Sequence, residues 1–154
     1  LDPMRPVVTN DGWEHTVSDI LTIHDYEESG DALYHRFRDK DEFLGTDMNA
    51  ANGLKRIFAK GFGYQGQPVI LSEFGGIAFD SGEGWGYGNK VSDDEAFLKR
   101  FASVHEAIQR IPYVVGYCYT QVSDVEQEIN GIVRADRSAK VPLESLKRVN
   151  ELRE

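Results

Sequence analysis

The chain has 154 residues, 40% of them hydrophobic and 28% charged, a composition typical of a soluble globular domain rather than a disordered or fibrous chain. Its net charge of -9 repels phosphate groups and argues against nucleic acid and against anionic membranes as partners. The longest apolar runs are far shorter than the roughly 20 residues of a membrane span.

Two strands are predicted near the start of the chain, at residues 6–9 and 19–23. Both are short runs of β-branched residues bounded by turn residues, which is typical of strands. The stretch 27–45 is rich in charge and is predicted to be a long loop. Thr46 is placed to cap a helix over residues 47–60, because apolar side chains recur there at helical spacing.

The second half of the chain is also predicted to alternate strands with helices. A strand is predicted at residues 68–71, then a glycine-rich loop over residues 75–91. Ser92 and Glu95 have the spacing of a capping box, and the apolar pattern continues to Ile111. A strand at residues 113–118 and a helix that starts at Pro142, with Leu143, Leu146 and Val149 facing inward, complete the series.

Strands that alternate with amphipathic helices predict an α/β fold with a parallel sheet, in which ligands bind at the carboxyl ends of the strands. Polar loops are common, so a single polar strand end means little. Four such ends together favour a cleft that binds carbohydrate. The residues at these ends are Asn10, Asp11, His24, Asp25, Tyr26, Glu73, Tyr119 and Gln121.

Glu73 is the strongest candidate for catalysis, because it follows an apolar strand and precedes Phe74-Gly75-Gly76. A carboxylate there has the rigid placement that a nucleophile needs, although a buried Glu paired with Arg fits the same pattern. Asp11 and Asp25 are possible partner carboxylates, since glycoside hydrolysis uses two. Asp25 is equally suited to cap a loop.

Aromatic side chains at these ends can stack on sugar rings. They are Trp13, Trp85, Tyr26, Tyr117 and Tyr119. Residues 82–88 alternate glycine with other residues but lack the Lys-Ser/Thr ending of a phosphate loop, so we interpret them as an aromatic loop beside the active site. His15, His35 and His105 show no metal-ligand spacing, and Cys118 is the only cysteine, so no cofactor, metal or disulfide is predicted.

In this order, four segments resemble the second half of the catalytic (β/α)₈ barrel of glycoside hydrolase family two, the β-galactosidase, β-glucuronidase and β-mannosidase family. They are residues 2–7, 19–26, 68–75 and 116–131. The resemblance implies that residues 1–154 form the C-terminal portion of the catalytic domain, with strands five to eight of the barrel. A complete barrel needs roughly 200 residues or more, which this chain lacks.

The resemblance also implies a retaining exo-β-glycosidase that forms a covalent glycosyl-enzyme intermediate on Glu73. The family's acid/base residue lies in an Asn-Glu motif upstream of the Asp-Pro-x-Arg-Pro segment and is absent here, so we expect the isolated chain to be inactive. The family's glucuronidases carry an Asn-x-Lys motif, whereas this chain has Asn130-Gly131-Ile132, which favours a β-galactosidase-like substrate.

The expected partners are a carbohydrate, the remainder of a parent glycosidase chain, and further copies that pair through open sheet edges. The first residue is Leu1 rather than Met, so we expect an excised piece of a longer, cytoplasmic protein. Two other interpretations stay open: a non-catalytic carbohydrate-binding module, and a small doubly wound α/β domain unrelated to glycosidases.

Overall fold

The computed structural model describes residues 2, 4–45, 55–80 and 83–151. Within these ranges, a parallel three-stranded sheet has the order β1-β2-β3, and four helices accompany it, which confirms the predicted α/β fold. The elements along the chain are β1 (Leu21–Asp25), α1 (Gly30–Phe37), α2 (Lys40–Gly45), β2 (Val69–Gly75), α3 (Asp94–Gln109), β3 (Val114–Thr120) and α4 (Leu143–Asn150). None of these helices has the length and apolar character to span a membrane.

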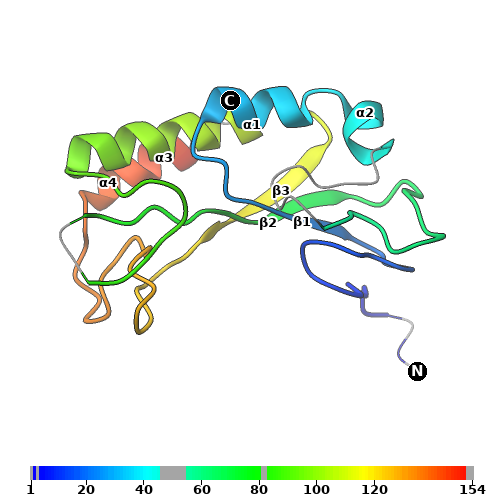
Figure 1. Ribbon diagram of the computed structural model, residues 1–154, viewed down its shortest axis with the longest axis horizontal. Helices are drawn as coiled ribbons and strands as arrows, with labels where there is room; N and C mark the ends of the chain where they lie inside the picture. Colours follow the sequence, from blue (N-terminus) through cyan, green and yellow to red (C-terminus); the bar gives the residue numbers. More distant parts are fainter. Residues whose placement is uncertain (1, 3, 46–54, 81–82, 152–154) are drawn as a thin grey trace.

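The helices lie together over one face of the sheet, and the N-terminal segment lies on the opposite side (Figure 1). The buried side chains of β1 and β2, such as Ile23 and Phe74, belong to the same apolar core as Leu33 of α1 and Val104 of α3. The burial of these apolar side chains supplies the main stabilisation of the fold, at about 25 cal/mol for each Å² of apolar surface that is removed from water. This packing fixes the strands, and polar residues lie at their carboxyl ends.

The predicted first strand, residues 6–9, is wrong: this segment is irregular. The amide of Val7 donates to the side chain of Asp19 at Oδ2 (2.7 Å). Its carbonyl accepts from the backbone amide of Asp19 (2.8 Å) and from the hydroxyl of Ser18 (3.2 Å), so a single backbone hydrogen bond joins the two segments here instead of a ladder. Val7 and Val8 are also 52% and 40% exposed, so the apolar run is not buried as a central strand would be.

The predicted long loop over residues 27–45 is also wrong, because it contains α1 and α2. The hydroxyl of Ser29 accepts a hydrogen bond from the amide of Ala32 and so caps α1. Leu33 and Phe37 lie one turn apart and are buried. Many charged residues on the exposed side of these short helices hid the helical pattern.

The predicted helix over residues 47–60 lies partly outside the described residues, and the described part, residues 55–60, is not helical. Phe58 instead forms a bridge with His15. Helix α3 was predicted correctly, but its cap is Asp93 rather than Ser92: Oδ1 of Asp93 accepts from the amide of Ala96 at 2.8 Å.

Helix α4 follows Pro142, which occupies the cap position rather than the first turn. Leu146 is buried and Val149 is partly buried, as predicted, whereas Leu143 is 54% exposed. The side of α4 that packs on the fold therefore carries Leu146 and Val149, and Leu143 lies outside it.

Candidate active site

Glu73 lies near the carboxyl end of β2, beside His24 of β1. The pairing of the two strands is shifted between Ile23 and His24, so Ile23 pairs with Leu71 and His24 pairs with Glu73. Ser72 is the extra residue of this bulge. A bulge breaks the strict alternation of side chains between the two faces. Successive residues, Ser72 and Glu73, can therefore both reach the group of polar side chains around His24.

The carboxylate of Glu73 receives its shortest contact from Tyr26. The Tyr26 hydroxyl donates a hydrogen bond of 2.6 Å to Oε2 of Glu73. Burial, and then this hydrogen bond, raise the pKa of Tyr26 well above its ordinary value of 10. Tyr26 therefore keeps its proton and remains a donor to Glu73 at every physiological pH.

His24 lies between two carboxylates. Its Nδ1 is 3.1 Å from Oε2 of Glu73, and its Nε2 is 3.1 Å from Oδ2 of Asp11. The His24 side chain is 9% exposed, whereas those of Glu73 and Asp11 are 37% and 54% exposed. Solvent, and hence a ligand, can reach both carboxylates while the imidazole stays enclosed.

Asp11 is fixed from several sides. The hydroxyl of Ser72 donates to its Oδ1 at 2.7 Å. Partial burial by itself raises the pKa of Asp11, but hydrogen bonds from Ser72, Thr22 and His24 outweigh it and lower the pKa below the usual value. Asp11 is therefore a stable anion, and it completes a group that we call the carboxylate cluster: Asp11, His24, Tyr26, Ser72 and Glu73.

The wall beside His24 is formed by the turn that carries Trp13. The Trp13 ring meets the His24 ring edge-on, with centroids 4.9 Å apart, and the ammonium of Lys55 lies 3.7 Å from the Trp13 centroid. Gly12 allows this close approach: its φ is 89°, and a Cβ there would lie 2.5 Å from the His24 ring. Only glycine meets both requirements at this position.

The glycine-rich loop forms an aromatic wall beside Tyr26. The ring of Tyr87 stacks on Tyr26 with centroids 3.3 Å apart and planes within 7°. Trp85 meets Tyr87 edge-on and is 44% exposed. The amide of Tyr87 donates to the carbonyl of Gly76 (2.8 Å), and a Cβ on Gly76 would collide with the Tyr87 ring. The loop is therefore attached to the end of β2 and places an exposed indole next to the cluster.

The structure brings together Glu73, Tyr26, His24 and Asp11 from the predicted set, but it places Asp25 and Tyr119 elsewhere. Asp25 is fully buried, and its Oδ2 accepts a hydrogen bond of 2.5 Å from Nη1 of Arg36. Burial raises the pKa of Asp25 in spite of that partner. An acid enclosed in this way cannot contact a sugar, so Asp25 orders the start of α1 instead.

Tyr119 packs in the core on Phe74 and Phe101, and its hydroxyl accepts a hydrogen bond of 3.1 Å from the amide of Ile77. Tyr117 and Tyr119 lie two residues apart on β3 and both contact Phe74, so they share a side of the sheet, and that side faces the helices. The expected shared hollow of Glu73 and Tyr119 is therefore wrong.

Asn10 and Gln121 hold loops. The side-chain amide of Asn10 donates to the carbonyl of Trp13 at 2.8 Å and so closes the turn that carries this indole. The amide of Gln121 donates to Oδ1 of Asn130 (2.7 Å) and to Oε2 of Glu128 (3.2 Å). Both contacts order the surroundings of the site; a direct role in binding stays a prediction.

Three residues with roles in the site were missed from the sequence: Ser72, Tyr87 and Arg36. Ser72 acts through a bulge, for which no local sequence signal exists. Tyr87 lies in the loop that we expected to carry aromatic residues, so composition gave a partial signal. Arg36 pairs with Asp25 from a helix that was predicted to be a loop.

The carboxylate cluster also contains the described residues best placed to hold a metal ion. Asp11, His24 and Glu73 each offer one ligand atom, and these atoms lie within 4.8 Å of one another. A zinc ion requires about 2.0–2.1 Å to a histidine nitrogen, so His24 would have to give up one of its carboxylate contacts to bind it. In the structure the two ring nitrogens of His24 instead lie 3.1 Å from the two carboxylates.

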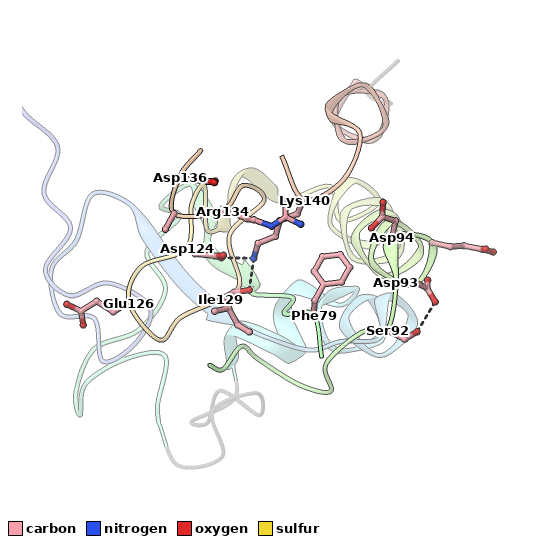
Figure 2. A pocket seen from close by; sticks show the side chains of 12 residues that line it. Phe79, Ser92, Asp93, Asp94, Asp124, Glu126, Ile129, Arg134, Asp136 and Lys140 are labelled. Atoms are coloured by element: carbon pink, nitrogen blue, oxygen red, sulfur yellow. Dashed lines mark hydrogen bonds and ion pairs between the residues drawn. The ribbon is translucent and has the colours of Figure 1, made fainter. Parts of the chain in front are cut away.

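A cavity of about 910 Å³ lies between the loops that follow β2 and β3 and the start of α3, and its lining includes no member of the carboxylate cluster (Figure 2). Nζ of Lys140 closes one side through contacts with Asp124 (2.6 Å) and the carbonyl of Ile129 (2.7 Å), near the ring of Phe79. This cavity is not the candidate active site, because the side chains of the carboxylate cluster all lie outside its lining.

Comparison with known proteins shows which solved structures have a similar fold. No protein-family model matches the chain, and no curated protein matches it in sequence. Among solved structures, a β-glucuronidase of Bifidobacterium dentium in complex with coumarin-3-O-glucuronide matches 87% of this chain with a TM-score of 0.55 and 20% identity. A β-glucuronidase of Faecalibacterium prausnitzii matches 88% with a TM-score of 0.56 and 18% identity. An exo-β-agarase matches 86% with a TM-score of 0.54 and 15% identity.

These similarities show a shared fold. The chain spans 21% and 22% of the length of the two β-glucuronidases and 15% of the exo-β-agarase. The α/β architecture thus corresponds to one part of each larger protein.

Proposed function

We propose that this chain belongs to the second half of a (β/α)₈ barrel, to which β1, β2 and β3 contribute three strands, from a retaining exo-β-glycosidase, and that Glu73 is its nucleophile. The observation that carries the proposal is the position of Glu73. It is a solvent-accessible carboxylate at the carboxyl end of a parallel strand, and its Oε2 is held by both Tyr26 and His24. The fold similarity to β-glucuronidases supports the same assignment.

In the proposed reaction, the carboxylate of Glu73 attacks the anomeric carbon, and the bond from that carbon to the leaving oxygen breaks. A second carboxylic acid gives its proton to the leaving oxygen and then takes a proton from the water that hydrolyses the glycosyl ester. Both observed contacts end on Oε2, so we assign the attack to Oε1. Tyr26 and His24 then fix the carboxylate in one orientation, which favours a single line of attack.

The second acid lies upstream of this chain in our proposal, because Asp11 has the wrong properties. Ligand oxygens of Asp11 and Glu73 lie within 4.8 Å, close to the roughly 5–5.5 Å between the two carboxyl groups of retaining enzymes. However, the His24 ring contacts both of them, so no sugar fits between. A general acid also needs a raised pKa, whereas that of Asp11 is lowered.

Trp85 and Trp13 are the proposed stacking surfaces for the sugar. Trp85 projects from the aromatic wall, and Trp13 lies against His24 on another side of the cluster. We propose a neutral, β-galactosidase-like substrate, because Asn130 is fully buried, bonds Gln121 and is followed by no Lys at the second position. Lys55, next to Trp13, is the cation that a glucuronide would contact instead.

The remaining strands of the barrel are the proposed partner of this chain. Val115 of β3 is 57% exposed and Cys118 is also exposed, although both lie in a strand of the sheet. In a closed barrel, inward-facing residues of this kind are covered by layers of side chains from the other strands. The isolated chain is therefore expected to lack turnover.

The test uses the full-length protein that contains this chain. It is treated with 2-deoxy-2-fluoro-β-galactosyl fluoride and, separately, with the glucuronyl fluoride, and the labelled peptide is sequenced. We expect a galactosyl adduct on Glu73. A glucuronyl adduct on Glu73 would keep the nucleophile and correct the sugar, whereas an adduct on another residue would refute the assignment of Glu73.

The matched variants are Glu73→Gln and Glu106→Gln. Glu106 is an exposed glutamate on α3, so its replacement controls for the loss of one surface carboxylate. Only Glu73→Gln should abolish labelling. Unchanged sugar binding in Glu73→Gln, together with no labelling of the parent protein by either reagent, would indicate a binding module.

A further inference from the structure

We infer that Arg100 of α3 is a positioning residue for Tyr26, and that it acts by holding Tyr87 of the aromatic wall in place. The inference rests on the proposed function only for the role of Glu73, which Tyr26 contacts. The observation that carries it is the guanidinium of Arg100, which donates to two carbonyls of the glycine-rich loop: Nη2 to Tyr87 at 2.9 Å and Nη1 to Asn89 at 2.7 Å.

The orientation of Tyr87 depends on the two peptide groups that flank its α-carbon. The first group is fixed because the Tyr87 amide donates to the carbonyl of Gly76 at 2.8 Å. The second group is fixed because the Tyr87 carbonyl accepts from Arg100. With both peptide planes held, the two backbone dihedrals of Tyr87 are set, and so is the direction in which its ring leaves the chain. This direction lays the ring flat on Tyr26, with centroids 3.3 Å apart.

Glu28 takes part in the same contact. Its Oε2 lies 3.2 Å from Nη1 of Arg100 and accepts from the Asn89 amide at 2.8 Å, and its Oε1 accepts from the Asn89 side chain at 2.7 Å. The Arg100 side chain is only 10% exposed, so little water competes for these hydrogen bonds. Glu28, Asn89 and Arg100 therefore form one hydrogen-bonded group, which we call the Arg100 network.

The packing of α1 on α3 brings Glu28 and Arg100 together. The amide of Gly30, the first residue of α1, donates to the hydroxyl of Ser103 at 3.2 Å. Arg100 precedes Ser103 by three residues and so shares its side of α3, while Glu28 lies two residues before Gly30. A Cβ on Gly88, whose φ is 68°, would lie 2.6 Å from both Nη2 of Arg100 and Oε2 of Glu28. Only glycine allows the loop to approach the network this closely.

The geometry of the network requires arginine rather than any cation. A guanidinium presents several N–H donors in one plane, so it can bind two carbonyls and a carboxylate at once. A lysine ammonium is a point charge on a flexible stem. A network that served only as an ion pair with Glu28 would tolerate lysine, whereas one that orients the Tyr87 carbonyl would not. Arg100→Lys thus separates the two explanations.

Tyr87 acts on the carboxylate cluster by restricting Tyr26. The Tyr26 hydroxyl donates to Oε2 of Glu73 only while its ring stays in its present rotamer, and the Tyr87 ring covers one face of it. Without that cover the phenol would sample other rotamers and spend less time as a donor to Glu73. Arg100 therefore influences the nucleophile through two tyrosines without contacting it.

The first test uses the 154-residue chain with ¹³C-labelled tyrosine rings. We expect nuclear Overhauser contacts between the ring hydrogens of Tyr26 and Tyr87 in the parent chain, and their loss in Arg100→Met and Arg100→Lys. Arg110→Met is the matched control, because Arg110 is an exposed arginine at the other end of α3 and lies 4.0 Å from the Tyr34 centroid. It should change the signals of Tyr34 and leave those of Tyr26 and Tyr87 unchanged.

Gly88→Ala provides an independent variant if Arg100→Met does not fold, because its methyl group displaces the loop from the network. Gly66→Ala is its control, since Gly66 has a φ of 90° but no atom within 4 Å of a built Cβ. Amide spectra of each variant establish that the fold is retained. Ring contacts as strong in Arg100→Met or Gly88→Ala as in the parent would overturn the inference, as would their absence from the parent chain.

The effect on Glu73 is measured in the full-length protein, from the rate of labelling at saturating 2-deoxy-2-fluoro-β-galactosyl fluoride. Arg100→Met should slow this rate by about two- to tenfold, the rate equivalent of one aromatic pair. In the Tyr26→Phe background the same substitution should cause no further slowing, since the hydroxyl that it misplaces is gone. Arg110→Met should label at the parent rate.

The outcomes separate the inference from the proposed function. Equal slowing by Arg100→Met in both backgrounds would show that Arg100 acts without the Tyr26 hydroxyl, and an unchanged rate would show that it does not act on Glu73. Either result would overturn the inference and leave the nucleophile in place. A parent protein that is never labelled would refute the proposed function, while the ring contacts would still decide whether Arg100 holds Tyr87 on Tyr26.

Discussion

The Tyr26 hydroxyl lies 2.6 Å from Oε2 of Glu73, across 47 residues of sequence. Tyr26 follows β1 and Glu73 lies near the end of β2, so the contact depends on the parallel pairing of these neighbouring strands. It orients the carboxylate of Glu73 with a donor that does not lose its proton under physiological conditions.

Tyr26→Phe removes this donor and retains the ring that stacks on Tyr87. A hydrogen bond to a charged group contributes about 1.5–3 kcal/mol, so labelling of Glu73 in the full-length protein should slow by about ten- to a hundredfold. Tyr113→Phe is the control, since its hydroxyl donates to the carbonyl of Phe37 and takes no part in the cluster. Equal rates in the two variants would contradict the role of Tyr26.

Gly12→Ala should destabilise the chain and displace His24. The φ of Gly12 is 89°, which costs a residue with a Cβ about 1–2 kcal/mol, and the collision with His24 adds to this. Gly61 has the same φ but no atom within 4 Å of a built Cβ, so Gly61→Ala isolates the backbone cost. Urea unfolding should show a larger loss of unfolding free energy for Gly12→Ala than for Gly61→Ala. Equal losses in the two variants would mean that His24 moves aside without a cost in stability.

Arg36→Met should cost about 3–5 kcal/mol at pH 7, because it leaves the buried carboxyl of Asp25 without a cation. The double variant Arg36→Met/Asp25→Leu removes both partners and should recover much of this loss. The free energy of unfolding of all three proteins, from urea titrations, provides the comparison. A double variant as unstable as Arg36→Met alone would show that the pair matters through shape rather than charge.

His105 should make the chain sensitive to acid. Burial lowers its pKa from 6.5 to about 4. As the pH falls below 6.5, the unfolded chain binds a proton at His105 that the folded chain does not, so the stability falls between pH 6.5 and 4 by about 3 kcal/mol. His105→Gln should flatten this part of the curve of unfolding free energy against pH, whereas His35→Gln, at an exposed site, should not. Parallel curves for all three proteins would exclude His105 as the cause.

Local sequence was sufficient to place three polar side chains at one end of the sheet but not to predict how they contact one another. Glu73, His24 and Tyr26 were predictable because an apolar run followed by polar residues marks the end of a buried strand. The contact of Glu73 with His24 depends on the bulge at Ser72, which arises from the pairing of two strands and has no local pattern. Tyr119 shows the same limit: alternation put it on the side of Tyr117, but only the packing of α3 shows that this side is the core.

Val115→Lys should reduce self-association. Val115 is 57% exposed on β3, and in the described residues β3 pairs only with β2. Lysine on an edge strand opposes strand-to-strand pairing between copies. Sedimentation velocity should show a dimer for the parent chain and a monomer for Val115→Lys, with Val125→Lys as a control at an equally exposed loop position. A monomeric parent chain would remove the edge of β3 as an interface.

The side chain of His15 donates to the carbonyl of Thr22 on β1, and the amide of Leu21, one residue earlier, donates to Pro68 before β2. Because backbone groups of successive strand residues point to opposite sides, the Thr22 carbonyl faces away from β2, where an imidazole now occupies it. A strand added at this point of β1 would have to displace His15 from the Thr22 carbonyl. Two isolated chains that pair through the edge of β3 around a twofold axis would each use that edge up, so the contact would close at two copies.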